Sequence, residues 1–165
     1  MTEGLTVQHG AEAAGVAPRR LAFDCIAEVL RSRTALADVF EARRAGTGLS
    51  GRDEALARAI ATVAFRHLGT IRHALAARLD KGMPSDERLA IVLIVGAAQI
   101  LFLDVPNHAG VDTAVRLAAS DKRLRGMTGV VNAVLRRLAR ERDAVLAGTD
   151  ALVSHRSSGG KVTIW

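Results

Sequence analysis

The chain has 165 residues, of which 49% are apolar; this excludes a disordered polymer and allows one domain with a hydrophobic core. Aromatic residues make up only 3%, which argues against a dense aromatic platform for stacking single-stranded bases. The formal net charge of +6 favours an anionic partner, nucleic acid first and an acidic membrane or protein surface second. Genome composition remains a second explanation of the charge, because only three of the 23 basic residues are lysines.

The first residues and the cysteine count indicate the compartment. Residues 1–17 carry neither a basic residue nor an apolar run, so they predict a disordered lead and not a signal peptide. Cys25 is the single cysteine, which leaves no disulfide or cysteine-based zinc cluster within the chain and favours a cytoplasmic location. The most apolar stretch, 89–103, is shorter than the ~20 residues of a bilayer span. We therefore expect no membrane partner.

Helical periodicity recurs throughout the chain, and no stretch alternates convincingly with period two. A first helix is predicted to begin at Pro18, whose missing N–H is tolerated in a first turn. A short helix over 35–44 follows. Ser50 is the predicted N-cap of a long helix that runs toward Leu79.

The second half of the chain contains the predicted central helix and the two predicted helices that follow it. Ser85 or Asp86 caps the apolar helix over 89–103, which belongs in the centre of a bundle. Pro106 ends that helix and starts the next, and a last helix runs from Gly126 to a stop at Gly148. This gives six or seven helices in one all-α domain over 18–148. Residues 149–165 are expected to be a flexible linker or a truncated, non-native tail.

The side chains that catalysis needs do not form a recognisable set. Cys25 falls on the inward side of an apolar helix, and His67 falls in an apolar stripe, so both favour packing over chemistry. The sequence SSGGK near the end lacks the full spacing of a phosphate-binding loop. We therefore predict no catalytic residue, no cofactor and no metal, and expect that this chain is not an enzyme.

The stretch GVVNAVLRRLARER, 129–142, predicts an amphipathic helix with a basic outer face. Arg137 has Glu141 four residues on, whereas Arg136 and Arg140 have no acidic residue at that spacing. Taken alone, a basic helix face of this kind is more often simply exposed to solvent than used to bind a ligand. The helical spacing divides its residues into an apolar side of Met127, Val131, Val134, Leu135 and Leu138 and a polar side of Asn132, Arg136, Arg137 and Arg140.

Further basic clusters strengthen the case for a phosphate-binding surface, because the planar guanidinium fork matches phosphate. Two adjacent arginines at the predicted start of the first helix are poorly placed for its dipole, so helix stabilisation does not explain them. The predicted RNA-binding residues are Arg19, Arg20, Arg66, Lys122, Arg123, Arg125, Arg136 and Arg140.

Three segments in order resemble the NusB family of RNA-binding domains: GRDEALARAIATVAFRHLGTIRHAL, LAIVLIVGAAQILFLDVPNHAGVDTAVRLA and GMTGVVNAVLRRLARER. The resemblance covers roughly residues 19–142. Its RDEALAR and VNAVLRR segments are closer to the N-terminal domain of RsmB-type (Sun/Fmu) rRNA cytosine-5 methyltransferases than to the antitermination factor NusB. It implies a helical bundle of about seven helices in two three-helix subbundles.

The resemblance also implies a function. It implies RNA binding through Arg19 and Arg20, with help from the segment that leads into the last helix; antitermination factors commonly carry an aromatic there, where this chain has Val130. In the methyltransferases the domain is an accessory arm, and a following domain holds the catalytic cysteines. We therefore expect a non-catalytic, rRNA-binding accessory domain. The alternatives are an antitermination factor that binds boxA RNA with the ribosomal protein NusE, and a protein-interaction domain whose basic faces are only solvated.

Overall fold

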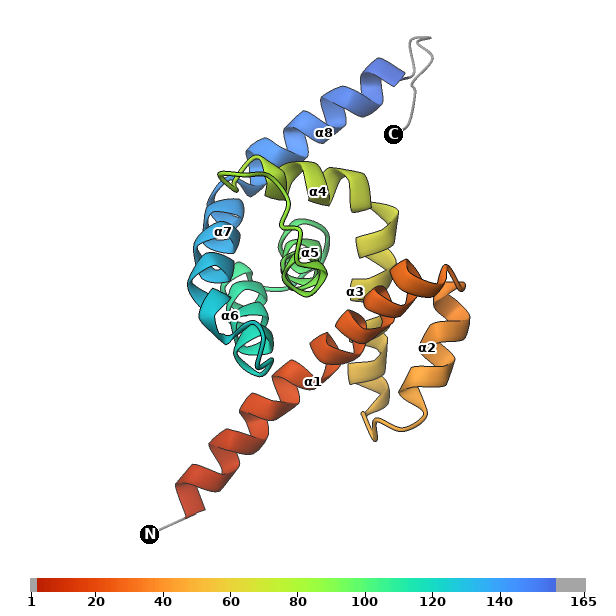
Figure 1. Cartoon of the computed structure of the whole chain (residues 1–165), viewed down its shortest axis with the longest axis vertical. Helices are drawn as coiled ribbons and strands as arrows, with labels where there is room; N and C mark the ends of the chain where they lie inside the picture. Colours follow the sequence, from red (N-terminus) through yellow and green to blue (C-terminus); the bar gives the residue numbers. More distant parts are fainter. Residues whose placement is uncertain (1–2, 157–165) are drawn as a thin grey trace.

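The computed structural model describes the backbone of residues 3–156 and the side chains of residues 15–149. Within that range the chain forms helices and no strand (Figure 1). In chain order the elements are α1 (Glu3–Ser32), α2 (Leu36–Arg44), α3 (Gly51–Arg66), α4 (Leu68–Ala76), α5 (Glu87–Phe102), α6 (Asn107–Ala119), the 3-10 turn η1 (Arg125–Met127), α7 (Thr128–Arg140) and α8 (Arg142–Arg156).

The apolar helix α5 lies at the centre of the bundle and is seen almost end-on in Figure 1. All of its residues from 89 to 101 are buried, as expected for a helix without a polar face. The helices α1, α2 and α3 pack on one another to form one group, and α5, α6 and α7 form a second. One continuous hydrophobic core joins the two groups. The predicted all-α bundle of two three-helix groups is confirmed.

The glycine within α5 is explained by the crossing of three helices. A Cβ on Gly96 would overlap the side chain of Leu135 in α7 and lie 3.2 Å from the Cβ of Ala114 in α6. Only a residue without a side chain lets these helices approach so closely. Gly96 therefore sets the distance between α5 and its two partners in the second group.

Two of the predicted caps are present. The hydroxyl of Ser50 accepts a hydrogen bond from the N–H of Asp53 at 3.2 Å at the start of α3. The carboxylate of Asp86 accepts one from the N–H of Leu89 at 3.1 Å at the start of α5. Both caps are local signals, which explains why the sequence was sufficient to predict them.

The predicted ends of three helices are wrong. The first helix begins at Glu3 and not at Pro18, which lies inside α1, so the helix also runs through residues expected to be a disordered lead. The long helix from Ser50 is interrupted at His67, which separates α3 from α4. The last helix is interrupted at Glu141, and Gly148 lies inside α8 instead of ending it. The domain limits at 18 and 148 stay predictions, and residues 157–165 lie outside the described part.

His67, at the interruption between α3 and α4, makes a tertiary contact. The His67 ring stacks on the Phe102 ring at the end of α5, with ring centroids 3.9 Å apart and an angle of 10° between the planes. Burial lowers the pKa of His67, with a smaller contribution from Arg66, which favours the neutral ring. This contact links residues far apart in the sequence, and it bears out the packing role expected for His67.

Candidate nucleic-acid interface

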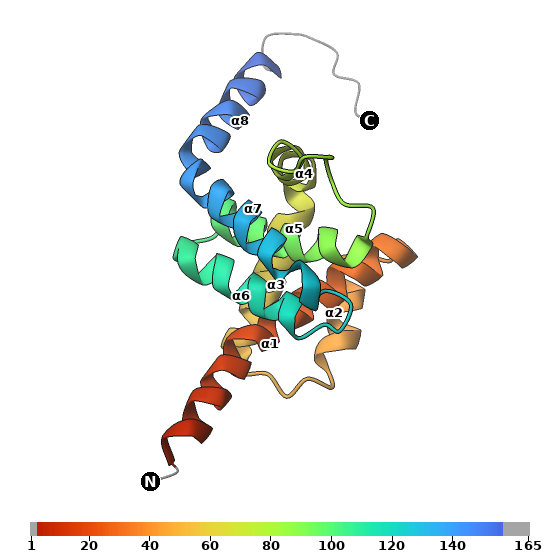
Figure 2. The same ribbon diagram turned by 60° about the vertical axis from the view of Figure 1, so that its left-hand side comes forward.

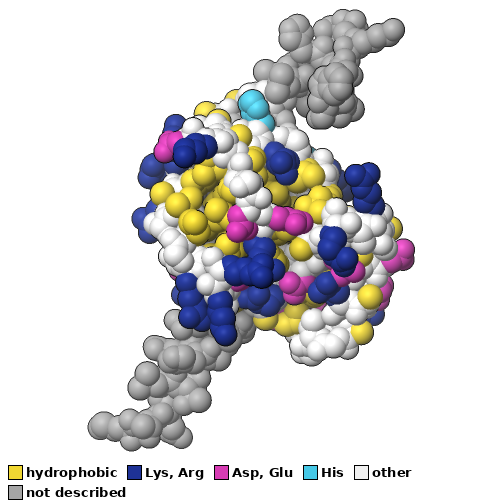
Figure 3. Space-filling view, viewed as in Figure 1, with side chains coloured by type: hydrophobic (Ala, Val, Ile, Leu, Met, Phe, Trp, Pro, Cys, Tyr) yellow, Lys and Arg dark blue, Asp and Glu magenta, His cyan; other side chains and the backbone are white. Residues whose placement is uncertain are grey.

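One corner of the bundle gathers basic side chains from two distant segments. Arg20 of α1 donates a hydrogen bond to the hydroxyl of Ser120, the residue that ends α6. The turn that follows carries Lys122, Arg123 and Arg125, all exposed. In Figure 3, Lys and Arg side chains gather over this turn, where α1 passes it. We refer to Arg20, Lys122, Arg123 and Arg125 as the basic corner.

The shape of this turn depends on Asp121. Its carboxylate accepts a hydrogen bond from the N–H of Arg123 at 2.9 Å and another from the guanidinium of Arg88 at 2.6 Å. Partial burial raises the pKa of Asp121, but the Arg123 N–H and Arg88 outweigh it and hold the pKa below its usual range. Leu124 is 1% exposed and fixes the turn to the core. An ionised aspartate and a buried leucine thus present the cations of the turn to solvent.

The three cations of the turn in the basic corner have no carboxylate partner among the described residues. Lys122 and the guanidinium of Arg123 make no hydrogen bond or ion pair with any described residue. Arg125 donates only to a backbone carbonyl, that of Ala119, at 3.2 Å. Several other exposed arginines do have a carboxylate partner; Arg43 pairs with Glu28, for example. An anion that binds at the corner would therefore displace few existing interactions.

The second predicted arginine of α1 is not part of this surface. Arg19 is only 8% exposed, and its Nε donates to the amide oxygen of the fully buried Gln99 at 2.9 Å. Its Nη1 donates to the Gly15 carbonyl at 3.0 Å. Burial lowers the pKa of Arg19, and Asp53 only partly opposes this. Successive residues on a helix point about 100° apart, so Arg19 and Arg20 face different surroundings; Arg19 connects α1 to α5.

The amphipathic pattern of α7 is largely as predicted. Val131, Val134, Leu135 and Leu138 are buried, and Arg137 pairs with Glu141 at 3.1 Å. Met127 differs, with 43% of its surface exposed. It lies in the 3-10 turn before α7, so the spacing of the helix does not apply to it.

Arg136 and Arg140 lie away from the basic corner. Together with residues of α6 they line a groove of about 460 Å³ between α6 and α7. The Nε of Arg136 donates to the side-chain oxygen of Asn132 at 3.0 Å. Arg66 lies at a third place, exposed at the end of α3. The eight predicted residues are therefore divided among the corner, the groove, the core and the end of α3.

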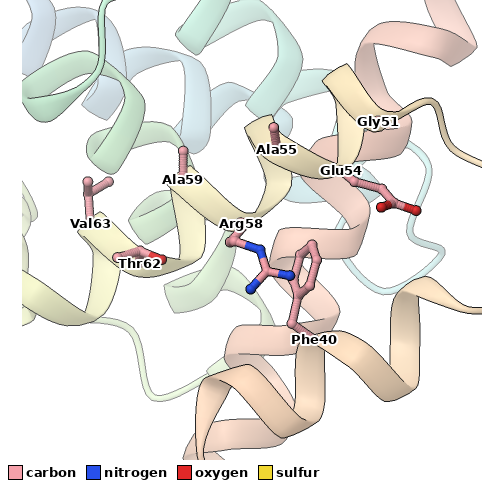
Figure 4. Close-up of a pocket in the computed structure, with 8 residues that line it drawn as sticks. All are labelled: Phe40, Gly51, Glu54, Ala55, Arg58, Ala59, Thr62 and Val63. Carbon is pink, nitrogen blue, oxygen red and sulfur yellow. The ribbon is translucent and has the colours of Figure 1, made fainter.

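Two further hollows lie elsewhere on the described surface. The groove in Figure 4, about 510 Å³, lies on α3 beside Phe40 of α2. Its single arginine, Arg58, lies over the Phe40 ring at 4.3 Å and pairs with Glu41 at 2.9 Å. A hollow of about 300 Å³ beside Arg20 contains Asp24, whose pKa is raised by burial against the effect of nearby arginines. Both hollows therefore contain a carboxylate beside their arginines, Glu54 in the first and Asp24 in the second.

Chemically reactive side chains are not assembled in the described part of the chain. Cys25 is fully buried, and burial raises the pKa of its thiol to about 11, so it is a packing residue as expected. Residues 15–149 contain no group of three or more side chains suited to a metal ion. Among the helices whose residues are described, none is both long and apolar enough to cross a membrane.

Fold and site together define a class: an all-α domain with a basic surface and a packed, unreactive core. Within that class the chain belongs to the NusB family, whose model matches residues 16–140. The fold is similar to that of T. maritima NusB, with a TM-score of 0.64, 20% identity, and coverage of 79% of this chain and 91% of that one.

Two curated relatives carry the name ribosomal RNA small subunit methyltransferase B. The Xanthomonas campestris protein is 35% identical over 130 residues, and the Proteus mirabilis protein is 29% identical over 129. Each match covers 78% of this chain but only 29% and 30% of the respective relative. The matched part is the N-terminal portion of the methyltransferases, and the NusB domain is non-catalytic.

Proposed function

We propose that this chain binds RNA and that the basic corner contacts the phosphate backbone. The observation that carries the proposal is the contact of Arg20 with Ser120, which joins the arginine of α1 to the basic turn. Two segments a hundred residues apart in the sequence thereby form one cationic surface. Arginine and lysine side chains without carboxylate partners are suited to phosphate, since binding does not first break an ion pair.

Within this function, the role that we favour is that of an rRNA-binding accessory domain. The support is the similarity to the N-terminal portion of methyltransferases that act on small-subunit ribosomal RNA by name. In such a role the domain holds rRNA while a separate catalytic domain modifies it. A cytoplasmic location, where ribosomes are assembled, belongs to the same proposal.

A second candidate is an antitermination factor that binds boxA RNA together with NusE. It is favoured by the fold match, which covers 91% of the T. maritima NusB chain. Val130 stands at the start of α7 and is 40% exposed, in place of the aromatic residue that we expect in that role. This weakens base stacking at the boxA position and places this candidate second.

Equilibrium binding to labelled RNA tests the proposal and separates the two roles. The full chain is titrated against fragments of small-subunit rRNA and against a boxA oligonucleotide, and purified NusE is offered in a pull-down. The accessory role predicts tighter binding to an rRNA fragment than to boxA and no retention of NusE. Retention of NusE with a preference for boxA would favour the second candidate. Absence of binding to every RNA at low salt would contradict both roles and leave a protein-interaction domain.

A further inference from the structure

The groove between α6 and α7 is a separate feature from the basic corner. The two helices lie side by side (Figure 2), and the short turn between them makes them antiparallel. Val111, Val115 and Ala139 are the apolar residues that line the groove. The polar lining residues are Asn107, His108, Asp112, Asn132, Arg136 and Arg140. Its volume of about 460 Å³ is in the range of small-molecule sites, which is roughly 300–1,000 Å³.

The electrostatics of the groove favour an anion. Asp112 is its acidic side chain, and the carboxylate pairs with Arg116 at 3.0 Å along the same helix. Arg136 is bound only to the neutral amide of Asn132, at 3.0 Å. Arg140 has no hydrogen bond or ion pair to any residue among 15–149. Two guanidinium groups one helical turn apart therefore face the groove without a carboxylate to neutralise them.

The apolar floor restricts the kind of anion that fits. A phosphate alone would leave Val111, Val115 and Ala139 uncovered, whereas a nucleotide also brings a flat base that can pack on them. In a duplex both faces of each base are stacked on its neighbours, so only an unpaired nucleotide offers a free face. The side-chain N–H groups of Asn132 remain available because its oxygen accepts from Arg136, and amide groups suit the edge of a base.

We propose that this groove binds one unpaired nucleotide of a single-stranded RNA segment, with Arg136 and Arg140 on the phosphate and the base on the apolar floor. The proposal rests on the RNA-binding function proposed above and adds to it a preference for single-stranded RNA. The basic corner contacts the backbone of any RNA, and the groove selects segments with an unstacked base.

The position of the groove on α7 supports a separate role. Asn132, Arg136 and Arg140 follow one another at intervals of four residues, so they lie on the flank of α7 that faces α6. Met127, in the turn before α7, and Val130, in the first turn of α7, are exposed and do not line the groove. A nucleotide bound between α6 and α7 would thus approach a different side of α7 from RNA bound at its N-terminal end.

Fluorescence anisotropy with two labelled RNAs tests the proposal: an unstructured single strand and a duplex with the same number of phosphates. One variant combines Arg136→Gln with Arg140→Gln. A second, Ala139→Leu, fills the floor and leaves every charge in place. The matched control combines Arg52→Gln with Arg72→Gln, two exposed arginines outside the groove. Thermal unfolding of each variant shows that the fold is retained.

The expected result is selective. Both groove variants should weaken binding to the single strand by roughly tenfold, because one removes the phosphate contacts of the bound nucleotide and the other its apolar contact, and both should leave duplex binding close to that of the control. Equal weakening on both RNAs, no effect of Ala139→Leu, or equal competition by an oligoglutamate peptide would overturn the inference. If the unaltered chain binds neither RNA, the proposed function fails as well; if it binds both and the groove variants behave like the control, only this inference fails.

Discussion

At the scale of single residues, the neighbours Arg19 and Arg20 have opposite roles. The sequence predicts both as RNA contacts, because adjacent arginines at a helix start look like a single cluster. The signal that separates them is the spacing of the apolar residues: Ala22, Phe23 and Ile26 are buried, and Arg19 precedes them at intervals of three, four and seven. A buried arginine on that stripe needs a polar partner, and Gln99 in the middle of α5 is that partner.

Replacement of Arg19 should therefore lower stability more than RNA affinity. Arg19→Ala leaves the side-chain oxygen of Gln99 buried without its partner, which costs about 1–3 kcal/mol of unfolding free energy. The double variant Arg19→Leu with Gln99→Leu should recover most of that loss, because neither partner is then left unsatisfied. Urea unfolding of the three proteins measures this. A double variant as unstable as the single one would mean that the hydrogen bond is not the cause.

The Asp121 carboxylate holds the basic turn in shape, so its titration should make the stability of the protein depend on pH. Its pKa is lowered in the folded state, so its contribution to stability is present above the unfolded value, near 4, and is lost as the pH falls through the folded value. Asp121→Asn should be less stable than the unaltered chain at neutral pH, and the difference should shrink in acid. Unfolding free energies between pH 7 and pH 3 check this; a constant difference would contradict the role of the charge.

At the scale of elements, the sequence predicts what is local and misses what is tertiary. The caps at Ser50 and Asp86 depend on residues three positions away, so a single sequence contains the signal. The stacking of His67 on Phe102, thirty-five residues on, is a tertiary contact that the sequence around the break does not show. The grouping of Arg20 with the basic turn depends likewise on how α1 crosses the end of α6. The composition of the chain predicts a cationic surface. Which basic side chains lie together on that surface depends on how the helices pack.

The close approach of α5 to α6 and α7 gives a prediction at this scale. Gly96→Ala should destabilise the protein by about 1–3 kcal/mol, because the added methyl group overlaps Leu135 where the core is tightly packed. Gly148→Ala is the control, since a Cβ there meets nothing within 4 Å and alanine is the better helix former. Thermal unfolding compares the two. A Gly96→Ala protein as stable as the unaltered one would show that the helices are free to move apart.

At the scale of the whole molecule, the chain is a rigid helical support with cations at its edges. The buried α5 fixes α1, α6 and α7 relative to one another, so the basic corner and the groove are held on one framework. The chain spans about 30% of the length of its methyltransferase relatives.

The salt dependence of RNA binding tests the central claim most directly. The combined change of Arg20, Lys122 and Arg123 to Ala should lower the slope of log affinity against log salt by roughly two to three units, because each lost phosphate contact removes nearly one. The same measurement on the variant with Arg52→Gln and Arg72→Gln should leave the slope unchanged. Equal slopes for the corner variant and the unaltered chain would contradict the assignment of the basic corner as the RNA-binding surface.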